Sequence, residues 1–191
     1  MTLLGMGPVA VLLPVKAFTE AKARLAPALA PAQRHALARD LATGVLMAAA
    51  PLPVAVVCDD IEVASWARDH RALVVWEPEQ GLNRAVEAGV ERLGAEGALR
   101  VIVAHADLPR ARDLAWVADF LGVTLVPDLA ANGTNVACVP TGSGFRFSYG
   151  PGSFARHRTE ASRLGMALRV VHDDRLARDV DVPADLAMAT E

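Results

Sequence analysis

The stretch that decides the fold is residues 8–25, PVAVLLPVKAFTEAKARL, in which an uninterrupted apolar run is followed at once by Lys16, Lys22 and Arg24. An apolar run without alternation is typical of a strand buried on both faces, as the strands of a parallel sheet are. The three cations fall within nine residues, where a core has no use for positive charge. We therefore expect a buried first strand whose carboxyl end opens into a site for phosphates.

Similar apolar runs recur along the chain, at PVAVVCDD, ALVVWEP, RVIVAHADLP and VTLVPD. Apolar residues with helical spacing lie between them, over residues 33–49, 82–93 and 114–121. Strands that alternate with helices predict an α/β domain with a mostly parallel central sheet flanked by helices.

The rhythm changes after Pro127. TNVACVP, FRFSYG and LRVVHD read as strands, residues 153–164 as a helix, and DVDVPADLAMA as an acidic loop that enters a final helix. No linker, repeat or composition shift divides the chain, so we expect one domain over residues 1–191.

The composition excludes several classes of protein. Hydrophobic residues make up 53% of the chain and charged residues 21%, as in globular proteins, and a net charge of −3 argues against a general nucleic-acid binder. The apolar run at residues 8–15 is too short to span a bilayer. Cys58 and Cys138 lack metal-ligand or redox spacing and fit core thiols of a cytoplasmic protein.

Acidic residues follow several of the expected strands. In open α/β sheets ligands bind beyond the carboxyl ends of the strands, and these positions hold Asp107 in ADLP, Asp128 after VTLV, and Asp179 and Asp181 near the C-terminus. Cations on one loop and carboxylates on others suit a polyphosphate with a divalent metal, because the carboxylates can hold Mg²⁺ while the cations hold phosphate oxygens.

The same residues also fit plainer roles, taken one at a time. Surface cations are usually only solvated, Asp107 is placed to cap a helix, and Asp59 and Asp60 read as helix-start residues. Asp181 or Asp185 fits helix-start chemistry near Pro183, and His105 reads as half-buried structure. Ser153, after GPG, fits an N-cap as well as an anion cradle, and His157 fits a packed histidine. No arrangement of nucleophile and base follows from the spacing.

Taken in order, the motifs PVKAFTEAKARL, GLNRAVEAG, ADLP, PDLAANGTNV, FRFSYGPGSFARH and DVDVPADL resemble the 2-phospho-L-lactate/phosphoenolpyruvate guanylyltransferase family of deazaflavin coenzyme (factor 420) biosynthesis. The resemblance runs from about residue 9 to residue 188. It implies a nucleotidyltransferase fold of the glycosyltransferase-A type. It also implies a reaction, in which the phosphate of phosphoenolpyruvate or 2-phospho-L-lactate attacks the α-phosphorus of GTP and pyrophosphate leaves.

The resemblance also implies roles for particular residues. The catalytic, triphosphate-binding cations would be Lys16, Lys22 and Arg24, and Asn83 would lie near the nucleoside. The Mg²⁺ ligands would be Asp107 and Asp181, with Asp179 as a further candidate. The residues around the acceptor would be Thr134, Gly150, Ser153 and His157. Such a transfer depends chiefly on positioning and electrostatics, which agrees with the lack of a nucleophile.

The implied partners are GTP as co-substrate, a three-carbon phosphoacid and a downstream transferase that uses the labile product; a homodimer is left open. Two alternatives stay open beside the guanylyltransferase. One is an enzyme of the same fold that acts on another phosphorylated acceptor, because Leu129 and two alanines follow Asp128 where the family often carries basic or polar residues. The other is a non-catalytic GTP-binding subunit.

Overall fold

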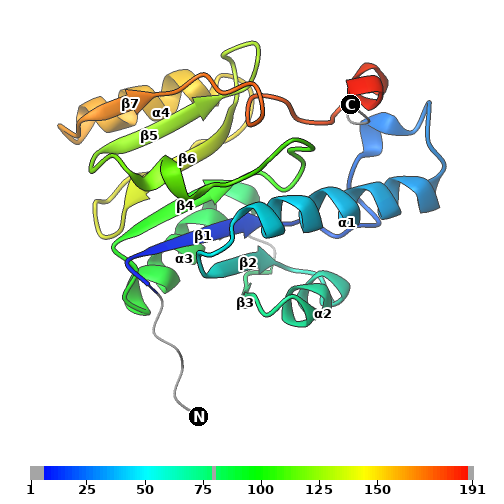
Figure 1. Ribbon diagram of the computed structural model, residues 1–191, viewed down its shortest axis with the longest axis horizontal. Coiled ribbons are helices and arrows are strands. Elements are labelled where there is room, and N and C mark those ends of the chain that lie inside the picture. The colour runs from blue at the N-terminus through cyan, green and yellow to red at the C-terminus, as the bar shows by residue number, and fades with distance from the viewer. Residues whose placement is uncertain (1–6, 79–80, 189–191) are drawn as a thin grey trace.

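The computed structural model describes residues 7–78 and 81–188. The strands of this part are β1 Val9–Pro14, β2 Val54–Cys58, β3 Leu73–Trp76, β4 Arg100–Ala104, β5 Val123–Pro127, β6 Thr134–Pro140 and β7 Leu168–Val170. They form one seven-stranded sheet in the order β3-β2-β1-β4-β6-β5-β7 (Figure 1).

The sheet is mostly parallel, as the sequence predicts. β1 pairs in parallel with β2 and β4, β2 with β3, and β5 with β7, whereas β6 runs antiparallel to both β4 and β5. The carboxyl ends of the parallel strands therefore meet the amino end of β6 at one edge of the sheet. Polar residues that follow these strands are brought to that edge.

Helices cover both faces of the sheet (Figure 1). The α-helices are α1 Pro31–Ala48, α2 Ile61–Asp69, α3 Gly81–Ala95 and α4 Ser153–Arg163, and the 3-10 turns are η1 Ala23–Leu25, η2 Ala115–Ala118 and η3 Pro183–Met188. Side chains of α1 and α2 share one core layer and those of α3 and α4 another. In the part of the chain that the structure describes, no helix has both the length and the apolar character needed to cross a bilayer.

The two core layers explain why the strands read as continuous apolar runs. In β1, Val11 and Leu13 belong to the layer under α1 and α2, whereas Ala10 and Leu12 belong to the layer under α3. Successive side chains of a strand point to opposite faces, so a sheet covered on both faces needs apolar residues at every position. α3 packs so closely on β1 that a Cβ at Gly89 would lie 2.6 Å from Leu12 Cδ2.

Three predicted elements differ in the structure. FRFSYG is not a strand, because its backbone N–H groups bond to side chains instead of a neighbouring strand: Ser148 N donates to His157 Nε2 and Tyr149 N to Asn83 Oδ1. The helix expected over residues 114–121 is only the 3-10 turn η2. Arg169 Nη2 donates hydrogen bonds to the carbonyls of Trp116 and Val117 there. The final helix is the 3-10 turn η3, and the last residue predicted for it, Ala189, lies outside the described residues.

Candidate active site

A cavity of about 380 Å³ opens at the carboxyl ends of β1, β2, β3 and β4, the edge at which the sequence predicts a ligand. Its apolar lining includes Val15, Phe18, Val57, Leu82 and Ala85. Its polar lining consists of Lys16, Lys22, Asp59, Glu77, His105 and Asp107. Apolar walls with a few convergent polar groups are typical of a small-molecule site.

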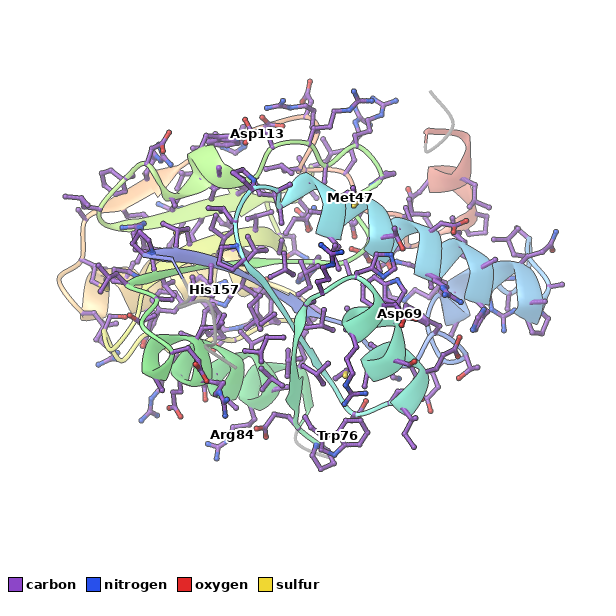
Figure 2. All side chains as sticks on the ribbon, turned by 60° about the horizontal axis from the view of Figure 1, so that its bottom comes forward. Met47, Asp69, Trp76, Arg84, Asp113 and His157 are labelled. Atoms are coloured by element: carbon purple, nitrogen blue, oxygen red, sulfur yellow. The ribbon has the colours of Figure 1, made fainter. Side chains whose placement is uncertain are left out.

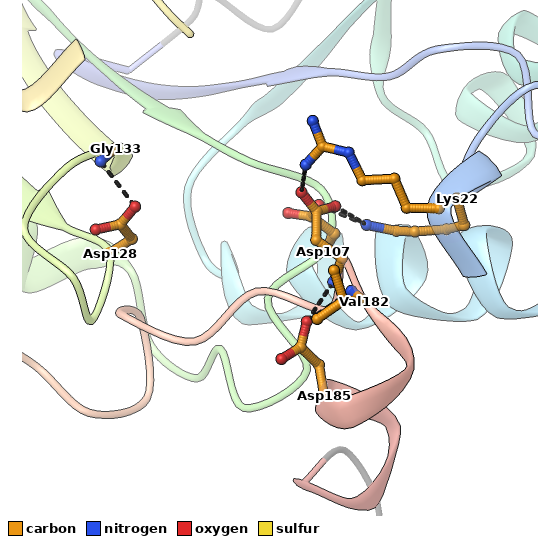
Figure 3. Close-up of polar contacts among 8 residues, drawn as sticks. Lys22, Asp107, Asp128, Gly133, Val182 and Asp185 are labelled. Carbon is orange, nitrogen blue, oxygen red and sulfur yellow. Dashed lines mark hydrogen bonds and ion pairs between the residues drawn. The ribbon is translucent and has the colours of Figure 1, made fainter. Parts of the chain in front are cut away.

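Lys22 lies at the cavity and is held between two carboxylates. Its Nζ lies 2.6 Å from Asp107 Oδ2 and 3.4 Å from Asp181 Oδ1, and its side chain is only 7% exposed (Figure 3). Its backbone lies in the left-handed region at φ 58°, which is uncommon for a residue other than glycine. Surrounding contacts must hold such a conformation in place, and strain of this kind gathers at functional sites.

Three carboxylates meet beside Lys22. Asp107, Asp179 and Asp181 each offer an oxygen atom within 4.8 Å of the others. The backbone joins them, because Val180 N donates to the carbonyl of Asp107 at 3.2 Å. Figure 1 shows the same proximity at the level of the chain, with the C-terminal turn η3 next to the segment after β1. The three carboxylates predicted as metal ligands are thus brought together.

The loop that carries two of these carboxylates is shaped by Asp185. Its Oδ2 accepts hydrogen bonds from the N–H groups of Asp181 and Val182, each at 2.8 Å (Figure 3). Of the two helix-start candidates in the sequence, Asp185 therefore fills this role. Asp181 is left to face Lys22 and Arg24.

The carboxylates fit a divalent cation. Asp107 Oδ1 is buried and has no hydrogen-bond partner among the described residues, and such an atom requires compensation. Burial raises the pKa of Asp179, and the negative charges of Asp107 and Asp181 raise it further. A second positive charge would relieve this repulsion, and hard oxygen ligands are those that Mg²⁺ prefers.

The other two predicted cations are far more exposed than Lys22. The side chain of Lys16 is 68% exposed and pairs with Glu20 at 2.9 Å. The side chain of Arg24 is 75% exposed, and its Nη1 lies 3.2 Å from Asp181 Oδ2. Exposed ion pairs contribute little to stability, so both side chains can turn toward an incoming anion at small cost.

Asn83 ties α3 to the FRFSYG segment. Its Oδ1 accepts from Tyr149 N at 2.6 Å, and its neighbours Leu82 and Ala85 line the cavity. The predicted contact of Asn83 with the nucleoside stays a prediction.

The predicted acceptor residues lie together, but the N–H groups of Thr134 and Ser153 already have partners. Thr134 N donates to Ser153 Oγ at 3.0 Å, and Ser153 N donates to the carbonyl of Gly150 at 2.9 Å. Thr134 and Ser153 are almost fully buried. Gly152 is the N-cap of α4 and Ser153 its first residue, so the N-cap reading of Ser153 is wrong by one position. Direct contact with an acceptor stays a prediction.

His157 lies deep among the side chains (Figure 2) and supports the FRFSYG segment from behind. Its Nε2 accepts from Ser148 N at 2.9 Å, so its proton sits on Nδ1, 3.0 Å from Thr134 Oγ1. Burial, and then the charge of Arg156, lowers the pKa of His157 to about 4. The ring is therefore neutral and matches the packed histidine that the sequence also allows.

The sequence did not point to four further residues, three that line the cavity and one that supports the Gly150 loop. Asp60 is the N-cap of α2, accepting from Val63 N at 3.0 Å, so the prediction that Asp59 also starts this helix is wrong. The missed residues are Asp59, Glu77 and His105, which line the cavity, and Arg156, which donates to the carbonyls of Ser148, Gly150 and Pro151. Of these residues, Asp59 could have been predicted to face a ligand, because it directly follows a buried strand.

Comparisons with known proteins agree with this geometry. The family described as "Guanylyl transferase CofC like" matches residues 9–189. A phosphoenolpyruvate guanylyltransferase of Sphaerobacter thermophilus is 35% identical over 188 residues, 91% of this chain and 88% of the relative. A 2-phospho-L-lactate guanylyltransferase of Halorubrum lacusprofundi is 37% identical over 177 residues, 87% of this chain and 77% of the relative.

Solved structures show the same fold at much lower identity. A nucleotidyl transferase from Methanothermobacter thermautotroptrophicus superposes with a TM-score of 0.67 at 14% identity, covering 94% of both chains. CMP:2-keto-3-deoxy-manno-octonic acid synthetase, complexed with CTP, has a TM-score of 0.63 at 14% identity, covering 95% of this chain and 96% of the other. These superpositions confirm the nucleotidyltransferase fold. The family match over residues 9–189 shows that this protein belongs to the CofC-like guanylyl transferase family.

Proposed function

We propose that the chain transfers GMP from GTP to phosphoenolpyruvate, with release of pyrophosphate, in deazaflavin coenzyme (factor 420) biosynthesis. Family membership and the names of the relatives support the reaction. The observation that carries it in the structure is the Lys22–Asp107–Asp181 cluster beside a cavity of about 380 Å³ that Lys22 and Asp107 line.

The reaction needs no covalent step on the protein. An oxygen of the acceptor phosphate forms a bond to the α-phosphorus of GTP, and the bond from that phosphorus to the bridging oxygen of the β-phosphate breaks. Pyrophosphate leaves with the electron pair. The product joins GMP to the three-carbon acid through a new phosphoanhydride.

Three cations would stabilise the charge that develops on the leaving group. We assign Lys16, Lys22 and Arg24 to the triphosphate, because all three lie on the segment after β1. Lys22 is preorganised by its carboxylate partners, and Lys16 and Arg24 can reorient. Preorganised charge of this kind is usually the largest contribution to such catalysis.

We further propose that Asp107, Asp179 and Asp181 hold Mg²⁺, which fits the buried, unpartnered Asp107 Oδ1. When bound, the ion would neutralise phosphate charge and help to align the triphosphate. Asn83 is assigned to the nucleoside end of the site.

The acceptor is assigned to the loop that carries Gly150, next to Thr134 and Ser153, with His157 behind it. Arg156 supports this loop through its bonds to three carbonyls. The present bonds of the Thr134 and Ser153 N–H groups would have to rearrange for these groups to contact the acceptor. The Halorubrum relative favours 2-phospho-L-lactate as a second candidate acceptor.

The remaining parts of the proposal concern cellular context. Cys58 and Cys138 are buried free thiols, which agrees with a reducing cytoplasm. We also propose that a downstream transferase takes up the product, whose new phosphoanhydride can serve as a group donor. A homodimer is also proposed and is tested by light scattering on the purified chain.

The decisive experiment measures pyrophosphate release with GTP and Mg²⁺ in the presence of phosphoenolpyruvate, 2-phospho-L-lactate, 3-phosphoglycerate or no acceptor. The downstream transferase is added as a trap for the product. Release that requires both GTP and one of the first two phosphoacids, and that is lost in Asp107→Asn while the fold is retained, would establish the reaction. The absence of release with every acceptor would overturn it.

A further inference from the structure

Asp59 and Glu77 place two carboxylates at the end of the cavity that lies away from Lys22. They directly follow β2 and β3, and Glu77 N donates to the carbonyl of Cys58 at 3.0 Å, so the two residues are neighbours. Neither belongs to the carboxylate cluster around Asp107. The phosphate and metal chemistry therefore leaves this end of the cavity unexplained.

Of the carboxylates near this end, that of Asp59 has no hydrogen-bond partner among the described residues. It also makes no ion pair with them, and the residue is exposed. Asp60 is occupied as the cap of α2, and Glu77 already interacts with another group. An uncommitted carboxylate that lines a cavity is available to accept hydrogen bonds from a ligand.

The order of the strands places Asp59 at a useful distance from the phosphate end. β1 lies between β2 and β4, so Asp59 and Asp107 follow strands that are two positions apart in the sheet. Neighbouring strands are about 4.8 Å apart, which separates the two strand ends by roughly 10 Å. This span is comparable to the reach from the α-phosphorus of a nucleotide, across the ribose, to the far edge of its base.

The lining between the two ends suits a flat base. Val15, Val57, Leu82 and Ala85 give it apolar surface. At its far edge guanine presents two donors, the N1–H and the exocyclic N2 amino group, which match the two oxygens of a carboxylate. Adenine presents an acceptor at N1, which a carboxylate repels. A site built to hydrogen-bond one ligand discriminates strongly against an analogue that lacks the partner group.

We propose that the Asp59 carboxylate accepts hydrogen bonds from N1–H and the N2 amino group of guanine and thereby selects GTP. The inference rests on the proposed function, since it concerns the nucleotide of the same reaction. It adds a residue that distinguishes guanine from other bases. The metal cluster and the cations cannot make this distinction, because they would contact groups common to all nucleoside triphosphates.

The test compares GTP, ITP and ATP in the wild type, Asp59→Asn and Asp60→Asn. ITP lacks only the N2 amino group of GTP. Asp60→Asn is the matched control, because it removes the neighbouring charge while asparagine still caps α2. Dissociation constants from calorimetry and kcat/KM from pyrophosphate release are measured for each pair.

We expect the wild type to prefer GTP to ITP. In Asp59→Asn, GTP binding should weaken by about 10- to 100-fold, as expected for a lost hydrogen bond to a charged group, and ITP binding should weaken less. The GTP:ITP ratio should thus fall toward one, while Asp60→Asn keeps the wild-type ratio.

An unchanged GTP:ITP ratio in Asp59→Asn, or an equal loss for all three nucleotides, would overturn the inference. If the wild type transfers GMP and the ratio is unchanged, the inference alone fails. If the wild type transfers nothing, the proposed function fails, and the dissociation constants still decide the role of Asp59.

Discussion

Lys22 Nζ lies 2.6 Å from Asp107 Oδ2, although the two residues are 85 positions apart in the chain. The same ammonium group lies 3.4 Å from Asp181 Oδ1, so one buried cation partly neutralises the carboxylates that we assign to the metal. Incoming phosphates offer Lys22 an alternative partner. We therefore expect this one side chain to couple the charge of the carboxylate cluster to the binding of nucleotide.

Lys22→Met should abolish turnover and strengthen Mn²⁺ binding in the absence of nucleotide by about 10-fold, because removal of a nearby positive charge favours a cation at the carboxylates. Titration of Mn²⁺ followed by electron paramagnetic resonance measures this affinity. Lys16→Met is the control: Lys16 pairs with Glu20 rather than with the cluster, so the affinity should not change. Weaker Mn²⁺ binding in Lys22→Met would contradict the assignment of the metal site.

Arg156→Ala should raise the KM for the acceptor by about 10-fold and leave the KM for GTP nearly unchanged. The guanidinium holds the carbonyls of Ser148, Gly150 and Pro151, and hydrogen bonds to a charged group contribute about 1.5–3 kcal/mol. Steady-state kinetics with each substrate varied in turn separates the two effects. Arg158→Ala, on the same helix but over the ring of Phe154, should leave both constants unchanged. Equal effects of the two variants would show that the loop is not held by Arg156.

His157 should make the protein less stable in acid. Its pKa is about 4 in the folded state and about 6.5 when unfolded, so the unfolded state takes up a proton first as the pH falls. The free energy of unfolding should therefore fall between about pH 6.5 and pH 4, by about 2 kcal/mol at pH 5 relative to pH 7.

Urea unfolding at pH 7 and pH 5 measures this difference. His157→Gln should reduce it, whatever the stability of that variant at pH 7. His35→Gln, which changes a partly exposed histidine paired with Glu62, should retain most of it. The same slope in wild type and His157→Gln would rule out His157 as the source.

Two glycine substitutions should change stability in opposite directions. Gly89→Ala places a Cβ 2.6 Å from the fully buried Leu12 and should destabilise by about 1–3 kcal/mol. Gly44→Ala, also within a helix, meets no heavy atom within 4 Å and should stabilise by up to about 1 kcal/mol. Thermal and urea unfolding report both changes. A neutral Gly89→Ala would mean that α3 can move away from β1 without loss.

The sequence by itself determined the central strands and the character of the site. The run at Val9–Pro14 is apolar at every position because both faces of β1 are covered, and this is a local property that a sequence displays directly. The edge where strands end was predictable for the same reason, so Lys22 and Asp107 could be assigned to one site before their contact was known.

Only the tertiary structure decided which hydrogen-bond partners the backbone N–H groups of the FRFSYG segment have. FRFSYG has the composition of a strand, but Asn83, 66 positions before Tyr149, and His157, on the following helix, accept hydrogen bonds from its N–H groups and leave it irregular. The cap of α2 is by contrast a local hydrogen bond, from Val63 N to Asp60 Oδ1, and Asp59 is left to line the cavity. Apolar periodicity reports whether a residue is buried, whereas the choice of hydrogen-bond partner depends on which distant groups the folded chain brings within about 3 Å.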